Sequence, residues 1–125
     1  MDEAEPQGTP AVPQENCART ILFIEDDIYI SDMLAKYFRD QQYIIECLYD
    51  GEEALRRVGE REEMAGVDVV LLDLLLPNIN GFEILKKLKT DPATKTIPVI
   101  VVSNLGAQEH IDEARRLGAS AYIIT

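Results

Sequence analysis

The stretch that decides the fold is VDVVLLDLLLPNING, residues 67–81. Residues 67–72 are an almost continuous apolar run of the length expected for a strand buried on both faces. Asp73 follows this run directly, and a turn comes next, marked by Pro77, Asn78, Asn80 and Gly81. A helix is expected over residues 82–88. The stretch therefore predicts a strand, a turn and a helix, with a carboxylate at the carboxyl end of the strand.

The same alternation continues on both sides of this unit. Further strands are expected over residues 20–24, 43–48, 97–102 and 121–124, and further helices over residues 27–39, 51–64 and 106–117, the last ended by Gly118. Apolar strands joined by helical right-handed crossovers predict a doubly wound, parallel five-stranded α/β sheet. The helix that would follow the fifth strand is missing. We expect one domain over residues 19–125 and a disordered extension over residues 1–18, which carry three prolines and no apolar period.

Composition excludes several classes of function. The 125 residues are 46% hydrophobic, enough for a core, and 12 basic against 23 acidic residues give a net charge of −11. That charge repels phosphate backbones and anionic lipid, so we expect no direct nucleic-acid or membrane partner. No run approaches the ~20 apolar residues of a membrane span, and the acidic N-terminus is unlike a secretory signal. Cys17 and Cys47 cannot form a disulfide framework, so a cytoplasmic location is expected.

Polar residues end four of the predicted strands. The first strand is followed by Glu25 and Asp26, the third by Asp73, and the fourth and fifth end in Ser103 and Thr125. Ligands of open parallel sheets bind at the carboxyl ends of the strands, so these side chains are expected to meet. Three carboxylates in one place repel each other unless a divalent ion lies among them, and hard oxygen ligands favour Mg²⁺.

Each of these residues also has a purely structural interpretation. Glu25 and Asp26 are acids before a helix, where they favour its dipole and cap its first turn. The Ser103 hydroxyl can bond to nearby backbone. Asp73 can extend into solvent or cap the next helix, although three leucines and a proline separate it from that helix. The position of all of them at one edge of the sheet favours the functional interpretation.

These segments resemble the receiver domain of two-component response regulators. ILFIEDD is similar to the first strand and acidic pair of that family, and VDVVLLDLLLPNINGFEIL to its phospho-acceptor segment, with Asp73 as the acceptor. TDPATKTIPVIVVS places Ser103 at the switch hydroxyl position, and LGASAYII places Tyr122 at the switch aromatic position. The resemblance covers about residues 19–125 and implies the flavodoxin-like strand order 2-1-3-4-5.

The resemblance implies a phosphorelay switch rather than an enzyme with a separate substrate. A sensor histidine kinase or phosphotransfer protein would phosphorylate Asp73, and the domain would catalyse only its own phosphorylation and dephosphorylation. Mg²⁺ would be held by Asp26, Asp73 and the backbone carbonyl of Leu75, with Glu25 acting through water. Ser103 would then move toward the phosphoryl group and Tyr122 would turn inward, changing a surface that contacts a downstream effector protein.

The chain departs from the family at two places. Counted through GASAYIIT, Thr125 falls at the position of the family's lysine at the end of the fifth strand, and a short neutral hydroxyl cannot replace an ammonium group. Three explanations are open: a weakened switch, a register that slips by one residue, or a chain cut just before its lysine. The missing last helix leaves one face of the sheet bare, so we expect marginal stability or self-association through that face. Leu75 and Leu105 flank the site, and we expect their apolar side chains to hinder the water that hydrolyses an acyl phosphate.

Two other functions remain open at this point. A Mg²⁺-dependent phosphatase of the haloacid-dehalogenase type also uses an aspartate nucleophile, but it needs a second acid two residues later, where this chain has Leu75. A receiver-like interaction module that works without phosphorylation is the stronger alternative, because the lysine is absent.

Overall fold

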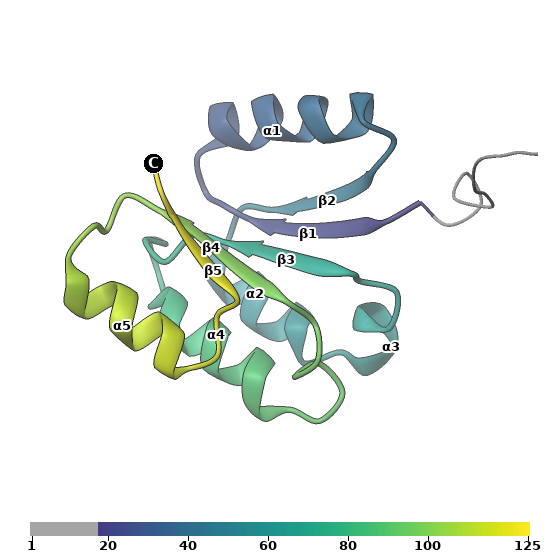
Figure 1. The fold of residues 1–125 in the computed structure, drawn as a ribbon. Helices are drawn as coiled ribbons and strands as arrows, with labels where there is room; N and C mark the ends of the chain where they lie inside the picture. The colour runs from purple at the N-terminus through teal and green to yellow at the C-terminus, as the bar shows by residue number, and fades with distance from the viewer. Residues whose placement is uncertain (1–17) are drawn as a thin grey trace, which may run out of the picture.

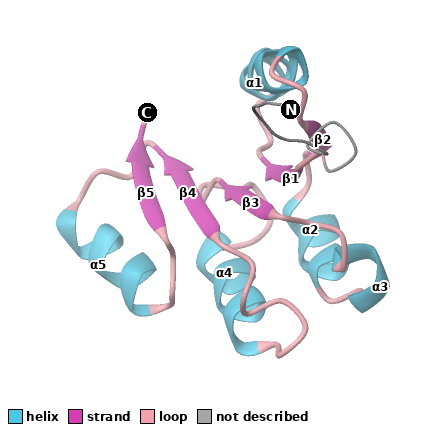
Figure 2. Ribbon diagram, turned by 45° about the vertical axis from the view of Figure 1, so that its right-hand side comes forward, coloured by secondary structure: helices cyan, strands magenta, loops and turns pink. Residues whose placement is uncertain are grey.

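The computed structural model describes residues 18–125, so nearly all of the extension expected over residues 1–18 lies outside the described residues. This part of the chain has five strands and five helices, which alternate except that α3 follows α2 directly (Figures 1 and 2). The strands are β1 (Thr20–Ile24), β2 (Ile44–Leu48), β3 (Val69–Leu72), β4 (Val99–Ser103) and β5 (Ala121–Ile124). The helices are α1 (Ile28–Asp40), α2 (Gly51–Val58), α3 (Arg61–Met64), α4 (Gly81–Thr90) and α5 (Gln108–Arg116).

The strands form one parallel sheet in the order β2-β1-β3-β4-β5, which confirms the predicted topology. β1 lies between β2 and β3, so that Phe23 is opposite Cys47 on one side and Leu71 on the other. α1 covers one face of the sheet, and the other four helices lie on the opposite face (Figure 1). Consecutive strand residues point to opposite faces, so both faces contribute to a core.

The larger core lies between the sheet and the helices α2 to α5. It takes alternate residues from the central strands, among them Leu22, Val70 and Val99, and packs them against α4. The smaller core lies under α1, where Phe23 and Leu71 pack against Ala35. This burial on both faces is the physical reason for the nearly uninterrupted apolar runs in the sequence.

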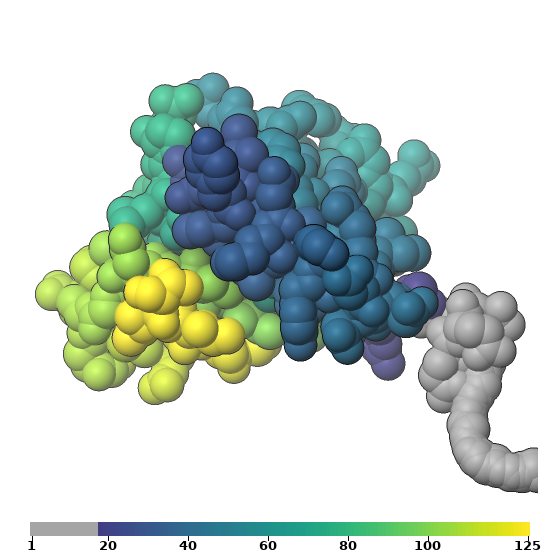
Figure 3. Space-filling model, turned by 90° about the horizontal axis from the view of Figure 1, so that it is seen from above, coloured from purple at the N-terminus to yellow at the C-terminus, as the bar shows by residue number. Residues whose placement is uncertain are grey.

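The face under α1 is only partly covered. Within residues 18–125, α1 is the one helix on this face, and it lies over β1 and β2 rather than over β5 (Figure 1). Figure 3 looks down on this face and shows β5, in yellow, uncovered beside α1, in blue. Ile123 of β5 is 52% exposed as a result. β5 is the last element of the described residues, which end at Thr125.

The prediction of a single helix over residues 51–64 is wrong. The structure has two helices there, α2 and α3, separated at Gly59 and Glu60. Gly59 ends α2 because glycine is a poor helix former, and its N–H donates to the Arg56 carbonyl. The change of direction buries Met64 in the larger core and brings Glu63 to 3.0 Å from the Arg57 guanidinium.

β2 begins one residue later than expected, at Ile44, and two other strands begin two residues later. β3 begins at Val69. The N–H of Thr20, the first residue of β1, donates to the side-chain carboxylate of Asp68 at 2.8 Å and is therefore not available to the backbone of β3. β4 begins at Val99, after Pro98, which has no N–H to give to the sheet. None of the helices within residues 18–125 combines the length and apolar character needed to cross a membrane.

Candidate functional site

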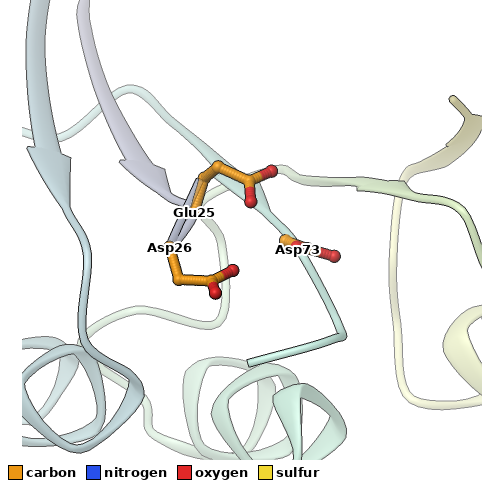
Figure 4. A group of neighbouring side chains, drawn as sticks. All are labelled: Glu25, Asp26 and Asp73. Carbon is orange, nitrogen blue, oxygen red and sulfur yellow. The ribbon is translucent and has the colours of Figure 1, made fainter. Parts of the chain in front are cut away.

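Three carboxyl groups meet at the carboxyl ends of β1 and β3. Ile24 and Leu72 are opposite each other in the sheet, so the residues that follow them, Glu25 and Asp73, leave the sheet at the same level. One carboxylate oxygen from each of Glu25, Asp26 and Asp73 lies within 4.8 Å of the others. Figure 4 shows the three side chains close together at the ends of these strands. The predicted convergence of the three acids is therefore confirmed.

The three acids of the loop after β1 have different roles. Asp27, rather than Asp26, caps α1, because its carboxylate accepts the N–H groups of Tyr29 and Ile30 at 2.9 and 3.2 Å. The Glu25 carboxylate accepts the N–H of Asp27 at 3.1 Å, which fixes its direction. Asp26 is exposed and has no part in the cap. The helix-start interpretation thus applies to Asp27 and leaves Asp26 available to a ligand.

Asp73 is fixed at the edge of the sheet and does not cap a helix. Its N–H donates to the Ile24 carbonyl at 2.9 Å, and its Oδ1 accepts the N–H of Leu75 at 3.0 Å. The cap of α4 is Asn80, whose side chain accepts the N–H of Phe82. Asp73 is only 8% exposed, so its carboxylate is held in a largely buried position.

Burial and mutual repulsion make these acids hard to ionise together. Burial raises the pKa of Glu25 to about 7, with smaller contributions from the nearby charges of Asp73 and Asp26. Burial also raises the pKa of Asp73, and the charge of Asp26 adds to the rise. A cation placed among them would relieve both effects. The donor set consists of oxygen atoms alone, which fits a hard divalent ion such as Mg²⁺.

Ser103 and Thr125 join the acids around one cavity of about 240 Å³. Ser103 is 2% exposed, and its Oγ accepts the N–H of Leu105 at 3.3 Å, so the local backbone bond expected from the sequence is present. Thr125 is tied to the same strand end, because its N–H donates to the Ser103 carbonyl at 2.9 Å. Asn104 also lines this cavity and was missed by the sequence reasoning, although its position directly after Ser103 was the available signal.

The surroundings of the two flanking leucines differ from those of Tyr122. Leu75 lines the acidic cavity. Leu105 does not line the acidic cavity but a neighbouring one, which Leu75 also lines. Tyr122 does not line the acidic cavity, although it lies close enough for the charge of Asp73 to act on its hydroxyl. It packs against the larger core, its hydroxyl donates to the Leu105 carbonyl, and burial raises its pKa.

Comparison with known proteins agrees with this geometry. The family model described as "Response regulator receiver domain" matches residues 21–124. The chain is 32% identical over 106 residues to the chemotaxis protein CheV2 of Helicobacter pylori, a match that covers 85% of this chain and 34% of CheV2. The chain thus spans about a third of that relative.

Solved structures of the same fold superpose on this one. The phosphorylated cyanobacterial phytochrome response regulator RcpA is 30% identical with a TM-score of 0.76, covering 86% of this chain and 80% of RcpA. The Mn²⁺-bound form of response regulator Rcp1 is 25% identical with a TM-score of 0.77, covering 85% of this chain and 80% of Rcp1.

Proposed function

Because this chain belongs to the response regulator receiver domain family, we propose that Asp73 accepts a phosphoryl group and that the chain transmits this signal through protein contacts. Receiver domains are signalling domains and not enzymes in the ordinary sense. The observation that carries the proposal is the buried Asp73 carboxylate held beside Glu25 and Asp26 at the carboxyl ends of β1 and β3. No observation on the described residues favours a phosphorylation-independent interaction module over this function.

The hydrogen bond from Leu75 prepares Asp73 for attack. It occupies Oδ1 and leaves Oδ2 to form the new oxygen–phosphorus bond. With a phosphohistidine donor, the phosphorus–nitrogen bond breaks as this bond forms, and the imidazole nitrogen keeps the electron pair. The domain contributes to its own phosphorylation by holding the acceptor oxygen in line.

Asp26, Asp73 and the Leu75 carbonyl would hold Mg²⁺, with Glu25 acting through water. When bound, the ion neutralises negative charge on the phosphoryl oxygens. The raised pKa values of Glu25 and Asp73 support this assignment, since acids that resist joint ionisation gain most from a cation. The Mn²⁺-bound form of Rcp1 supports it from a related structure.

Ser103 and Tyr122 are the proposed switch residues. The Ser103 hydroxyl would donate to a phosphoryl oxygen on Asp73, and its Oγ would then leave the N–H of Leu105. Tyr122 would turn inward once the Leu105 carbonyl moves away from its hydroxyl. Both movements act on the loop between β4 and α5, so this loop would carry the phosphorylation signal to the surface.

The proposed partners follow from this role. A sensor histidine kinase or phosphotransfer protein would supply the phosphoryl group, and an effector protein or domain would read the changed surface. We assign the receiver domain to residues 19–125 and treat a cytoplasmic location as part of the same proposal.

Intact-mass measurement after incubation with acetyl phosphate and Mg²⁺ tests the proposal. We expect a gain of one phosphoryl mass, absent in Asp73→Asn and present in Asp32→Asn, which removes an exposed carboxylate of α1 instead. Omission of Mg²⁺ should abolish the gain. An unmodified wild-type chain, with beryllofluoride also failing to bind, would favour the interaction module.

A further inference from the structure

A second cavity, of about 520 Å³, adjoins the acidic cavity and has no part in the function proposed above. Its walls come from the loop between β3 and α4, from Phe82 of α4, and from Leu105 and His110 before and within α5. α4 and α5 lie on the same face of the sheet (Figure 2). Leu75 lines both cavities, so the two are direct neighbours.

The lining of this cavity is apolar and aromatic, with a few polar groups and no charge. The side chains that decide its chemistry are those of Leu76, Ile79, Phe82, Asn78 and His110. No Asp, Glu, Lys or Arg is among its lining residues, all of which fall within residues 74–110. Its volume is within the range of about 300–1,000 Å³ found for small-molecule sites. This lining fits a small, uncharged, planar molecule.

The rings of Phe82 and His110 together form one wall. Their centroids are 6.3 Å apart and their planes are inclined by 33°. The Nδ1 of His110 is buried and has no hydrogen-bond partner among the described residues, which costs free energy. The imidazole can therefore turn toward a ligand without losing a bond at this nitrogen. An aromatic ligand would stack on the two rings, and an N–H donor on it would supply a partner for the imidazole.

Another wall of the cavity belongs to the proposed switch loop. The N–H of Leu105 donates to Ser103 Oγ, and its carbonyl accepts the Tyr122 hydroxyl. The residue before α5, Ala107, makes no side-chain cap bond that would fix the start of the helix. Movement of Ser103 toward Asp73 would therefore change this wall. A ligand that fills the cavity in its present shape favours the present arrangement.

We propose that this cavity binds a small, uncharged, planar aromatic molecule with an N–H donor, and that this ligand opposes phosphorylation of Asp73. The binding follows from the lining alone, whereas the opposition rests on the proposed function. The charged residues in the first turns of α4 and α5 are Glu83 and Glu109, which disfavour an anionic ligand. Linkage requires that beryllofluoride at Asp73 weakens the ligand by the same factor as the ligand weakens beryllofluoride.

An indole titration of the full chain, followed by the chemical shifts of backbone amides in NMR spectra, tests the binding. We expect saturation with a dissociation constant of roughly 0.1–1 mM, and the largest shifts within residues 78–82 and 105–110. 1-Methylindole lacks the N–H donor and should bind about three- to tenfold more weakly. Indole-3-acetate carries a negative charge and should also bind more weakly. Shifts centred on α1, or equal binding of the three compounds, would overturn the proposal.

Substitutions at His110 test the aromatic wall. His110→Ala should weaken indole about tenfold, whereas His110→Phe keeps a ring and should bind indole and 1-methylindole equally. Gln108→Ala is the matched control, because Gln108 is exposed on the same turn of α5 and does not line the cavity. Circular dichroism confirms that each variant is folded. An equal loss in Gln108→Ala and His110→Ala would overturn the proposal.

Titration calorimetry with beryllofluoride and Mg²⁺, with and without saturating indole, measures the coupling. We expect indole to weaken beryllofluoride about fivefold or more, and beryllofluoride to weaken indole by the same factor. Unchanged affinities in both directions would overturn the proposed opposition. Indole binding to a chain that binds no beryllofluoride at all would contradict phosphorylation at Asp73, and the opposing role of the ligand with it. The two failures are therefore distinguishable.

Discussion

The hydroxyl of Tyr122 donates a hydrogen bond to the backbone carbonyl of Leu105 at 2.5 Å. The N–H of the same Leu105 donates to Ser103 Oγ at 3.3 Å. One backbone residue thus connects the two proposed switch side chains. Any movement of Ser103 toward Asp73 breaks one of these bonds, and rotation of Tyr122 breaks the other.

Tyr122→Phe should therefore favour the phosphorylated arrangement. The hydroxyl stabilises only the arrangement seen here, and a typical hydrogen bond contributes about 0.5–1.5 kcal/mol. We expect beryllofluoride to bind about two- to tenfold more tightly in the presence of Mg²⁺, measured by titration calorimetry. Tyr49→Phe, at a tyrosine that is 42% exposed, should leave the affinity unchanged. Weaker binding in Tyr122→Phe would show that the hydroxyl supports the active arrangement instead.

The raised pKa of Glu25 predicts how stability depends on pH without metal. The pKa is 4.5 in the unfolded chain and about 7 in the folded chain. As the pH rises through this window, the unfolded chain loses its proton while the folded chain retains it. The free energy of unfolding should therefore fall from about pH 4.5 to about pH 7. The raised pKa of Asp73 acts in the same direction.

Urea denaturation in EDTA at a series of pH values measures this fall. Asp26→Asn removes one neighbouring charge and should make the fall smaller, and Mg²⁺ should raise stability most near pH 7. A free energy of unfolding that rises steadily from pH 4.5 to 7 in the wild-type chain would contradict the assignment.

The sequence was sufficient to predict the sheet and the acids at its rim. Apolar runs such as residues 67–72 indicate strands buried on both faces, and the carboxyl ends of parallel strands lie at one edge of the sheet. Asp73 could be singled out because a carboxylate is costly in such a run. The strand order itself came from the resemblance and not from periodicity.

Features that depend on tertiary contacts could not be predicted. The division of residues 51–64 has a local signal in Gly59, but the burial of Met64 in the larger core is a tertiary contact. The different surroundings of Leu75 and Leu105 also depend on how the loops after β3 and β4 fold.

Gly81 is required by the close approach of α4 to the acceptor strand. A Cβ at this position would lie 2.5 Å from Leu74 Cα and 2.8 Å from the Asp73 carbonyl oxygen. Because the obstacle is backbone, Gly81→Ala should lower the free energy of unfolding by about 1–3 kcal/mol. In Gly66→Ala, where nothing lies within 4 Å, the change should stay within about 0.5 kcal/mol. Equal stabilities of the two variants in urea would refute this explanation.

Thr125→Lys should restore a cation to the acidic cavity, since Thr125 lines it together with Asp73. An ammonium group near these carboxylates lowers their pKa values. We expect a smaller loss of stability between pH 4.5 and 7, and about tenfold tighter beryllofluoride binding. Ile124→Lys adds the same charge one residue earlier, where the strand points to its other face, and should have neither effect. Equal effects of both variants would indicate a general gain from lowering the net negative charge.

Leu75 and Leu105 looked equivalent in the sequence, and the structure separates them. Leu75 is 46% exposed and lines the acidic cavity, where it offers no hydrogen bond to a water that approaches phosphorus. Leu75→Asn supplies an amide that can orient this water, so the aspartyl phosphate should hydrolyse several-fold to about tenfold faster. Leu105→Asn is the matched control, and its effect should be smaller because Leu105 lines the neighbouring cavity. Loss of the phosphoryl mass over time measures both rates. A larger acceleration in Leu105→Asn would mean that water reaches the phosphoryl group from the side of α5.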